Sequence, residues 1–382
     1  MPGVTTMPEL GLRRLPRRAP AAALACGAFL KNSACLIDAE RADWSPLHGD
    51  LGEADACRAL EASVDALLAR HGAPVGAVAH DLHPDFHSTR HALALAARLG
   101  VPAVAVQHHH AHIVAVVAEH GLRGPVIGVA LDGIGFGSDG AAWGGEVLWV
   151  DGGDAAHRWQ RIAHLQPLRL PGGDVAAREP WRLAAALLHD LGRGEEIEPR
   201  FAPIVGATAA RTVKTMLERG LNCPPTSSAG RWFDAAAGAL GLSVRQSAEA
   251  EAAIALERRA QAWLGHDPAF DAPGRGLALR DVLAGLLDTD PHDAAAVARG
   301  AAAFHCALAN GLAQAALVAA RDRHVDDIVL GGGCFMNRVL SERLGAALRR
   351  AGLRVHAAQA MSCGDAGLAL GQAWIAACTR TH

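Results

Sequence analysis

The first part of the chain alternates short apolar runs with longer stretches in which apolar positions recur every three or four residues. Short apolar runs bounded by polar turns are typical of buried strands, and the longer periodic stretches are typical of amphipathic helices. From residue 21 the pattern predicts strand, strand, helix, strand, helix, strand and helix, in that order, over Ala21–Phe29, Cys35–Asp38, Leu51–Arg70, Val75–Ala79, Ser88–Leu99, Val101–Val106 and His108–His120. This alternation indicates an α/β lobe with a mixed sheet.

The rest of the chain begins in a similar way and then becomes helical. Two apolar strands separated by a glycine-rich turn, Val126–Leu131 and Glu146–Val150, predict a hairpin. The last part predicts strand, helix, strand and helix over Asp327–Leu330, Phe335–Arg350, Leu353–His356 and Asp365–Cys378. We therefore expect two lobes with a cleft between them, residues 21–122 and 123–382, with a helical insertion at about 175–325 and a last helix that packs back on the first lobe.

The N-terminus imitates a secretory signal. Four arginines between residues 13 and 18 precede the apolar run Ala21–Leu30, as in the charged and apolar regions of such a signal. Pro16 and Pro20 interrupt the approach, however, and the run passes directly into Lys31 and the next strand. We interpret the run as the first core strand, preceded by a disordered basic arm over residues 1–20.

Composition narrows the classes of function. Hydrophobic residues make up 51% of the chain, which allows a large core, and the 36 basic residues are balanced by 39 acidic ones. A net charge of -3 and the absence of tyrosine argue against a nucleic-acid partner. No apolar run approaches the roughly 18–20 residues that cross a bilayer, so no membrane span is expected. The eight cysteines form no C-x-x-C pair, which favours reduced thiols in a cytoplasmic protein.

Histidines are concentrated between residues 80 and 112. In the segment QHHHAH, His108 and His112 lie four positions apart, so on a helix both imidazoles face one side and can share a metal ion. His109 with His112 is the competing pair, and solvated surface histidines are the alternative to a metal site. A two-histidine site also needs an oxygen ligand from elsewhere. His83, His87 and His91 form a similar stripe, but Pro84 interrupts it, so we interpret them as structural or supporting residues.

Two glycine-rich segments follow predicted strands. In DGIGFGSDG, Asp132 at the strand end can hold a metal or its water. The glycines permit positive φ and close backbone approach, so that amides can point at phosphate, although a structural hairpin explains them too. Gly331–Gly333 separates a strand from a helix that carries Asn337 in its first turn, an arrangement suited to a nucleotide or to a tight turn. Asp234, in a helix opened by serines, can bind a ribose, and Asp365 can cap the last helix or serve as a ligand.

Taken together, these segments resemble the C-terminal, carbamoyl-transferring domain of the HypF family of hydrogenase-maturation carbamoyltransferases. That domain is similar to those of the threonylcarbamoyl-adenosine tRNA-modification enzymes and the antibiotic O-carbamoyltransferases. The resemblance implies an α/β, two-lobed fold of the actin, sugar-kinase and heat-shock-chaperone ATPase type (RNase H-like) with a nucleotide cleft between its lobes. The resembling stretches run in order from about residue 21 to 375: LACGAFLKNSACL, HDLHPDFHSTRHA, VQHHHAHIVAVVAEH, ALDGIGFGSDGAAWGGEVL, LPGGDVAAREPWR, TSSAGRWFDAAAGALGL, LGGGCFMNRVL and SCGDAGLALGQA.

The resemblance also implies roles for individual residues. His108, His112 and Asp365 match metal ligands, for which Fe(II) and Zn(II) are both suitable. Asp132 matches an aspartate that lies beside the metal and faces the phosphate, so Asp132 and His112 are the expected catalytic residues. The positions expected to bind carbamoyl-adenylate or ATP are Lys31, Asn32, Gly133, Gly135, Gly137, Asp234, Gly331, Gly332, Gly333 and Asn337. No role can be given to Gly172–Arg182, a segment specific to the HypF branch.

The activity that this resemblance implies is transfer of a carbamoyl group from carbamoyl-adenylate to the C-terminal cysteine thiol of a HypE-type partner. The partner would then dehydrate the product to the cyanide ligand of a [NiFe] hydrogenase. Full-length family members carry an acylphosphatase domain, C-x-x-C zinc fingers and a YrdC-like domain before this one, and residues 1–20 cannot hold them. We therefore expect a separate protein to form the adenylate, or this chain to be a fragment or degenerate copy.

Other functions use the same residues differently. Transfer to a small-molecule hydroxyl keeps the whole site, whereas transfer to tRNA requires a basic face that the charge balance does not favour. An ATP-binding, actin-like regulator or ATPase keeps the glycine segments but does not need His108 or His112. A metallohydrolase is disfavoured because no glutamate lies between the helical histidines to act as the base.

Overall fold

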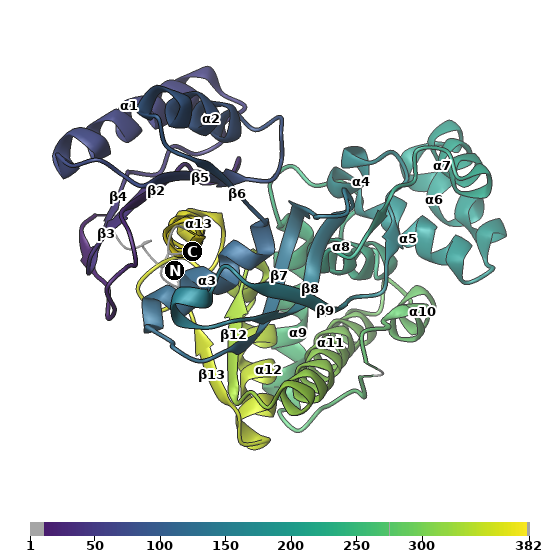
Figure 1. The fold of residues 1–382 in the computed structure, drawn as a ribbon. Helices are drawn as coiled ribbons and strands as arrows, with labels where there is room; N and C mark the ends of the chain where they lie inside the picture. The colour runs from purple at the N-terminus through teal and green to yellow at the C-terminus, as the bar shows by residue number, and fades with distance from the viewer. Residues whose placement is uncertain (1–10, 275, 380–382) are drawn as a thin grey trace.

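The computed structural model describes residues 11–274 and 276–379, and two β-sheets enclose a central pair of helices (Figure 1). The central pair is α3 (His108–His120) and α13 (Asp365–Thr379), which pack against each other along their length. Helix α13 covers one face of the first sheet, and α3 covers one face of the second. The two sheets are therefore joined through one layer of two helices, α3 and α13.

The first sheet has the strand order β1-β4-β3-β2-β5-β6, and α1 (Ala54–His71) and α2 (His87–Leu99) cover its outer face. The strands β2, β5 and β6 are parallel, whereas β1 to β4 pair antiparallel, so the predicted mixed sheet is confirmed. In chain order the strands are β1 (Arg13–Arg14), β2 (Ala23–Ala25), β3 (Cys35–Asp38), β4 (Arg41–Trp44), β5 (Ala77–Asp81) and β6 (Ala103–Val106).

The prediction of a disordered arm is wrong for residues 11–20, and residues 1–10 lie outside the described part of the chain. Arg13 and Arg14 pair with β4, a strand that the sequence pattern did not reveal. Leu15 and Ala19 are buried and belong to the core, and their amides donate to the carbonyls of Glu40 and Ala39. An alternation of buried apolar and exposed basic residues is an edge-strand pattern, in which arginines face solvent.

The second sheet has the strand order β10-β11-β8-β7-β12-β13, with β9 paired to β8. The predicted hairpin is confirmed, because β7 and β8 are antiparallel. Strand β7 is longer than predicted: it continues past Leu131 to Phe136, with an irregularity in its pairing between Leu131 and Gly135. The strands of the second sheet are β7 (Val126–Phe136), β8 (Ala142–Val150), β9 (Trp159–His164), β10 (Leu168–Arg169), β11 (Pro225–Thr226), β12 (Asp327–Gly331) and β13 (Arg354–Ala357).

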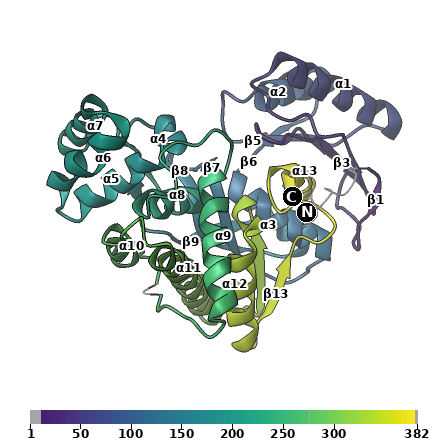
Figure 2. The ribbon, with the colours of Figure 1, turned by 180° about the vertical axis from the view of Figure 1, so that it is seen from behind.

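Helices α8, α11 and α12 cover the other face of the second sheet, and α9 packs against α11 and α8 (Figure 2). The helices between β10 and β12, and α12 after it, are α4 (Asp174–Arg178), α5 (Pro180–Asp190), α6 (Ile197–Val205), α7 (Ala207–Arg219), α8 (Ala229–Ala239), α9 (Glu251–His266), α10 (Arg280–Leu287), α11 (Ala294–Arg323) and α12 (Arg338–Arg350). Although no membrane span is expected from the sequence, α11 is long and apolar enough to cross a bilayer. Its most apolar window is 67% buried within the protein, which is typical of a core helix.

Candidate metal and nucleotide site

Two histidines at the start of α3 face the same point. The helix begins directly after β6, and Gln107 caps it by accepting a hydrogen bond from the amide of His110 at 2.8 Å. His108 and His112 are buried one turn apart, and their Nε2 atoms lie 3.2 Å from each other. The helical spacing of four therefore brings the two imidazoles together as the sequence pattern predicts.

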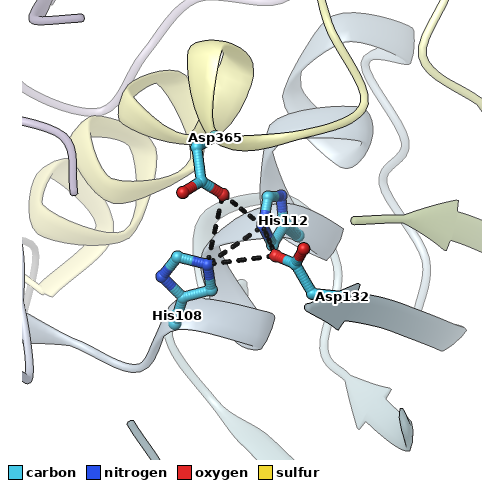
Figure 3. Close-up of side chains that lie close together, drawn as sticks. All are labelled: His108, His112, Asp132 and Asp365. Atoms are coloured by element: carbon cyan, nitrogen blue, oxygen red, sulfur yellow. Dashed lines mark hydrogen bonds and ion pairs between the residues drawn. The ribbon is translucent and has the colours of Figure 1, made fainter. Parts of the chain in front are cut away.

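Two carboxylates from distant parts of the chain complete the cluster (Figure 3). Asp132 comes from β7, and its Oδ2 lies 2.9 Å from His112 Nε2 and 3.3 Å from His108 Nε2. Asp365 is the first residue of α13, and its Oδ1 lies 3.4 Å from the Nε2 atom of each histidine. The four donor atoms lie within 4.8 Å of one another, so Asp132 joins the three residues that the sequence assigns to a metal.

The neighbouring histidines point elsewhere. His110 Nε2 lies 2.7 Å from the carbonyl oxygen of Ala156. His109 Nδ1 lies 3.0 Å from the side-chain nitrogen of Gln107, and burial holds the pKa of His109 well below its usual value. The geometry therefore favours the pair His108 and His112 over the alternative pair that includes His109.

The charges of the cluster fit a bound cation. Burial opposes the charged form of His108, but the carboxylates of Asp365 and Asp81 raise its pKa well above the usual value. The pKa of Asp132 lies well below its usual value because, against the effect of burial, both histidines donate to it. Two imidazoles and two carboxylates match the nitrogen and oxygen donors that Zn(II) and Fe(II) accept.

The cluster is accessible from its carboxylate side. The side chains of Asp132 and Asp365 are 14% and 20% exposed, whereas those of His108 and His112 are 3% and 1% exposed. A substrate therefore reaches the cluster past the carboxylates. A separate cavity of about 830 Å³ between α10 and α11 is lined by none of the predicted site residues.

The three glycines after β12 allow the chain to pass close to the cluster. A Cβ on Gly331 would lie 2.9 Å from the carbonyl oxygen of His112, and one on Gly333 would lie 3.1 Å from Asp132 Oδ1. Gly332 has a φ of 105°, and a Cβ there would lie 2.2 Å from the carbonyl oxygen of Leu131. Each of the three positions thus has its own reason for glycine, and the turn lies directly beside His112 and Asp132.

The glycines after Asp132 meet the expectation in part. Gly140 has a positive φ of 79°, whereas Gly133, Gly135 and Gly137 do not have positive φ, so that reason is wrong for these three. Close approach explains two of them: a Cβ on Gly135 would lie 2.6 Å from His109 Cε1, and one on Gly137 would lie 2.2 Å from Trp143 Nε1. Gly133 faces open space, with no atom within 4 Å of an added Cβ.

Asp234 lies buried on α8, near the same turn. Its Oδ1 accepts a hydrogen bond from Gln246 Nε2 at 3.0 Å, and its Oδ2 lies 3.0 Å from Arg231 Nη2 without hydrogen-bonding geometry. Burial raises the pKa of Asp234 to about 6, although Arg231 opposes this. The pKa of Cys334 is raised well above its usual value by burial and by the charges of Asp132 and Asp234, so all three lie in one region.

The segment of unknown role, Gly172–Arg182, supports Asp234. The side-chain Nε2 of Gln246, which donates to Asp234, also donates to the carbonyl of Ala177 at 2.9 Å. The backbone amide of Gln246 donates to the carbonyl of Arg178. Glu179 anchors the segment through Arg182 Nε at 2.5 Å. The sequence alone revealed neither Gln246 nor this connection, because the contact joins residues about seventy positions apart.

The remaining predicted nucleotide residues have partners within the protein. Asn337 caps α12 by accepting from the amide of Leu340 at 2.9 Å. Asn32 is buried and donates to the carbonyls of Cys26 and Ala28, both at 2.8 Å, which secures the first hairpin turn. Lys31 at that turn is 46% exposed and lies 2.9 Å from Glu249 Oε2 in the other lobe.

Comparisons with known proteins find similarity to one family over nearly the whole chain. The family model described as HypF Kae1-like domain matches residues 18–119, and the one described as carbamoyltransferase, Kae1-like domain, second subdomain matches residues 128–372. A carbamoyltransferase HypF homolog of Cupriavidus necator is 58% identical over 93% of this chain and 91% of its own length. Carbamoyltransferase HypF2 of the same organism is 47% identical over 95% of this chain but only 47% of its own length.

Two solved structures share the fold. Full-length HypF in a phosphate- and nucleotide-bound form superimposes with a TM-score of 0.82 at 29% identity, covering 97% of this chain and 48% of that one. T. kodakarensis HypF gives a TM-score of 0.85 at 28% identity, covering 98% of this chain and 49% of its own. The fold is therefore the two-lobed, actin-like ATPase fold, and the chain spans about half the length of most of these relatives.

Proposed function

Because the chain belongs to the HypF family of carbamoyltransferases, we propose that it transfers a carbamoyl group from carbamoyl-adenylate to a cysteine thiol at the C-terminus of a HypE-type maturation partner. The observation that carries this proposal is the convergence of His108, His112, Asp132 and Asp365 from three separate elements. A cation held there would lie beside a glycine turn, an arrangement suited to carbamoyl-adenylate, a mixed anhydride in which the carbamoyl carbonyl is bonded to the phosphate. The product, a thiocarboxamide, would serve the assembly of a [NiFe] hydrogenase.

The four clustered side chains would hold a divalent metal, Zn(II) or Fe(II). When bound, the metal supplies positive charge that neutralises the phosphate and polarises the carbamoyl carbonyl. The buried histidines fix its position, since α3 and the surrounding core leave their rings little freedom. Asp132 and Asp365, which are partly exposed, lie between this centre and the entering substrate.

The adenylate would extend from this centre along the turn after β12. Gly333 brings the backbone close to the Asp132 carboxylate, and the space beside Gly133, next to Asp132 in sequence, is open. Asp234 offers a buried carboxylate oxygen without a hydrogen-bond donor, which a ribose hydroxyl can supply. The nucleotide-bound form of a full-length HypF supports nucleotide binding in this family.

The transfer step needs no nucleophile from this chain. The incoming thiolate attacks the carbamoyl carbon, a carbon–sulfur bond forms, and the bond between that carbon and the phosphate oxygen breaks. AMP leaves with the electron pair, and the thiol proton passes to solvent. The cysteines beside the site do not compete, because burial raises the pKa of Cys363 to about 11 and that of Cys334 well above its usual value, so both remain protonated.

The test supplies synthetic carbamoyl-adenylate and the partner's C-terminal peptide, and mass spectrometry detects the carbamoylated cysteine. We expect transfer by the wild type and a loss of about 100-fold or more in His112→Ala, the size of effect found when electrostatic stabilisation is removed. His87→Asn is the matched control, since this half-buried histidine pairs with Glu61 and lies outside the cluster.

The outcomes separate the proposal from its alternatives. Equal transfer by the wild type and His112→Ala would contradict a role for the metal. An ATP hydrolysis rate that is the same with and without the peptide would favour an actin-like ATPase. Transfer to a small-molecule hydroxyl in preference to the peptide thiol would identify an O-carbamoyltransferase.

A further inference from the structure

Asp81 lies behind the metal cluster and is assigned no role by the reaction. It is the last residue of β5, and its side chain is 1% exposed. Its Oδ2 lies 2.7 Å from His108 Nδ1, the ring nitrogen that faces away from Asp132 and Asp365. Its Oδ1 accepts a hydrogen bond from the backbone amide of His83 at 3.0 Å. Both carboxylate oxygens therefore have defined partners.

These contacts determine where the imidazole protons lie. A backbone amide can only donate, so Asp81 Oδ1 must accept from His83, and Oδ2 remains for His108. A carboxylate oxygen at 2.7 Å from Nδ1 requires a proton on that nitrogen. With Nδ1 protonated, Nε2 is the only ring nitrogen of His108 that can offer a lone pair. That atom faces the three other donors of the cluster.

We propose that Asp81 is a positioning residue that holds His108 in the tautomer and ring orientation required for metal binding. The inference rests on the metal centre proposed above and extends it to a residue that does not touch the metal. A carboxylate hydrogen-bonded to the outer nitrogen of a metal-bound histidine fixes the ring and increases its basicity. The carboxylate of Asp81, held by β5, is suited to this because its own position is set by a backbone contact.

The substitution Asp81→Asn tests the direction of this hydrogen bond. The His83 amide needs an acceptor, so the asparagine oxygen would turn to it and the amide group would face His108 Nδ1. That nitrogen would then accept, and the proton would move to Nε2, the position of the metal. We expect the affinity for Zn²⁺, measured by competition with a chromophoric chelator, to fall about 10- to 100-fold.

Two further variants make the result specific. Thr89→Val removes a hydroxyl that donates to the main-chain carbonyl of Asp81 at 3.2 Å and leaves the carboxylate in place, so it should bind Zn²⁺ like the wild type. His108→Ala should lose binding more strongly than Asp81→Asn. Wild-type affinity in Asp81→Asn with loss in His108→Ala would overturn this inference alone, whereas unchanged affinity in both would overturn the proposed metal centre.

A measurement on the wild-type chain covers the case in which Asp81→Asn does not fold. A crystal structure of the Zn²⁺-loaded protein should show the metal on His108 Nε2, with Asp81 still within hydrogen-bond distance of Nδ1. Zinc bound to Nδ1, or an Asp81 side chain turned away from the ring, would contradict the proposal.

Discussion

At the residue scale, the carboxylates of the candidate site differ in how far their neighbours offset the effect of burial on the pKa. Asp132 and Asp365 have lowered pKa values: burial works against them, but both histidines stabilise their charged forms. Asp234 has no such pair of donors, and burial raises its pKa to about 6. A carboxylate with this pKa changes its charge just below neutral pH, so its ligand contacts should depend on pH.

Adenosine is the probe for this dependence, since it has no phosphate that titrates in the same range. If Asp234 accepts hydrogen bonds from the ribose, adenosine affinity should be constant above pH 7 and fall as the pH drops through about 6, because the protonated carboxyl loses acceptor capacity. Calorimetric titration at several pH values between 5 and 8 measures the adenosine affinity. Asp234→Asn should bind weakly with no such pH dependence, and a wild-type affinity independent of pH would contradict the ribose contact.

At the scale of elements, the close packing of α13 on α3 sets the position of Asp365. A Cβ on Gly371 would lie 1.9 Å from the carbonyl oxygen of Ala111, so only glycine permits this helix separation. Ala111 lies between His108 and His112 in sequence. The glycine on α13 therefore determines how far Asp365 lies from the two histidines of α3.

We expect Gly371→Ala to destabilise the protein by about 1–3 kcal/mol, because the added methyl group must displace backbone in a packed core. The same displacement should weaken Zn²⁺ binding, because Asp365 moves relative to His108 and His112. Chemical denaturation and chelator competition measure the two effects. Gly285→Ala is the matched control: it lies in α10 with no atom within 4 Å of an added Cβ, and it should be neutral or slightly stabilising. Unchanged Zn²⁺ affinity in Gly371→Ala would show that Asp365 does not depend on this contact.

At the scale of the whole molecule, the two lobes meet in an ion pair between Lys31 and Glu249. Their side chains are 46% and 58% exposed, so the pair should contribute less than about 1 kcal/mol to stability. Lys31 also lies close enough to Cys363 to lower the pKa of that thiol against the effect of burial. It is therefore near the start of α13 and the proposed phosphate position.

If Lys31 leaves Glu249 to contact the phosphate, Lys31→Ala should lower AMP affinity about tenfold, the size of one charge-assisted hydrogen bond. Glu249→Gln should keep or increase AMP affinity, because it removes a competing anion. Adenosine affinity serves as the control and should be unchanged in both variants. Wild-type AMP affinity in Lys31→Ala would remove this lysine from the phosphate site.

The sequence by itself determined the order of strands and helices in the segments that carry the candidate site residues. It also determined the alternation of strands and helices in the first lobe, the β7–β8 hairpin and the position of His108 and His112 on one helical face. These features depend on local periodicity: a spacing of four places two side chains on one helical face in any fold. The family resemblance assigned Asp132 and Asp365 to the same site as those histidines, but only tertiary structure decided how the four side chains meet, that Asp81 is hydrogen-bonded to His108, and that residues 11–20 add an edge strand. Such contacts join residues separated by up to about 250 positions, and they arise from close packing between elements, which no local pattern encodes.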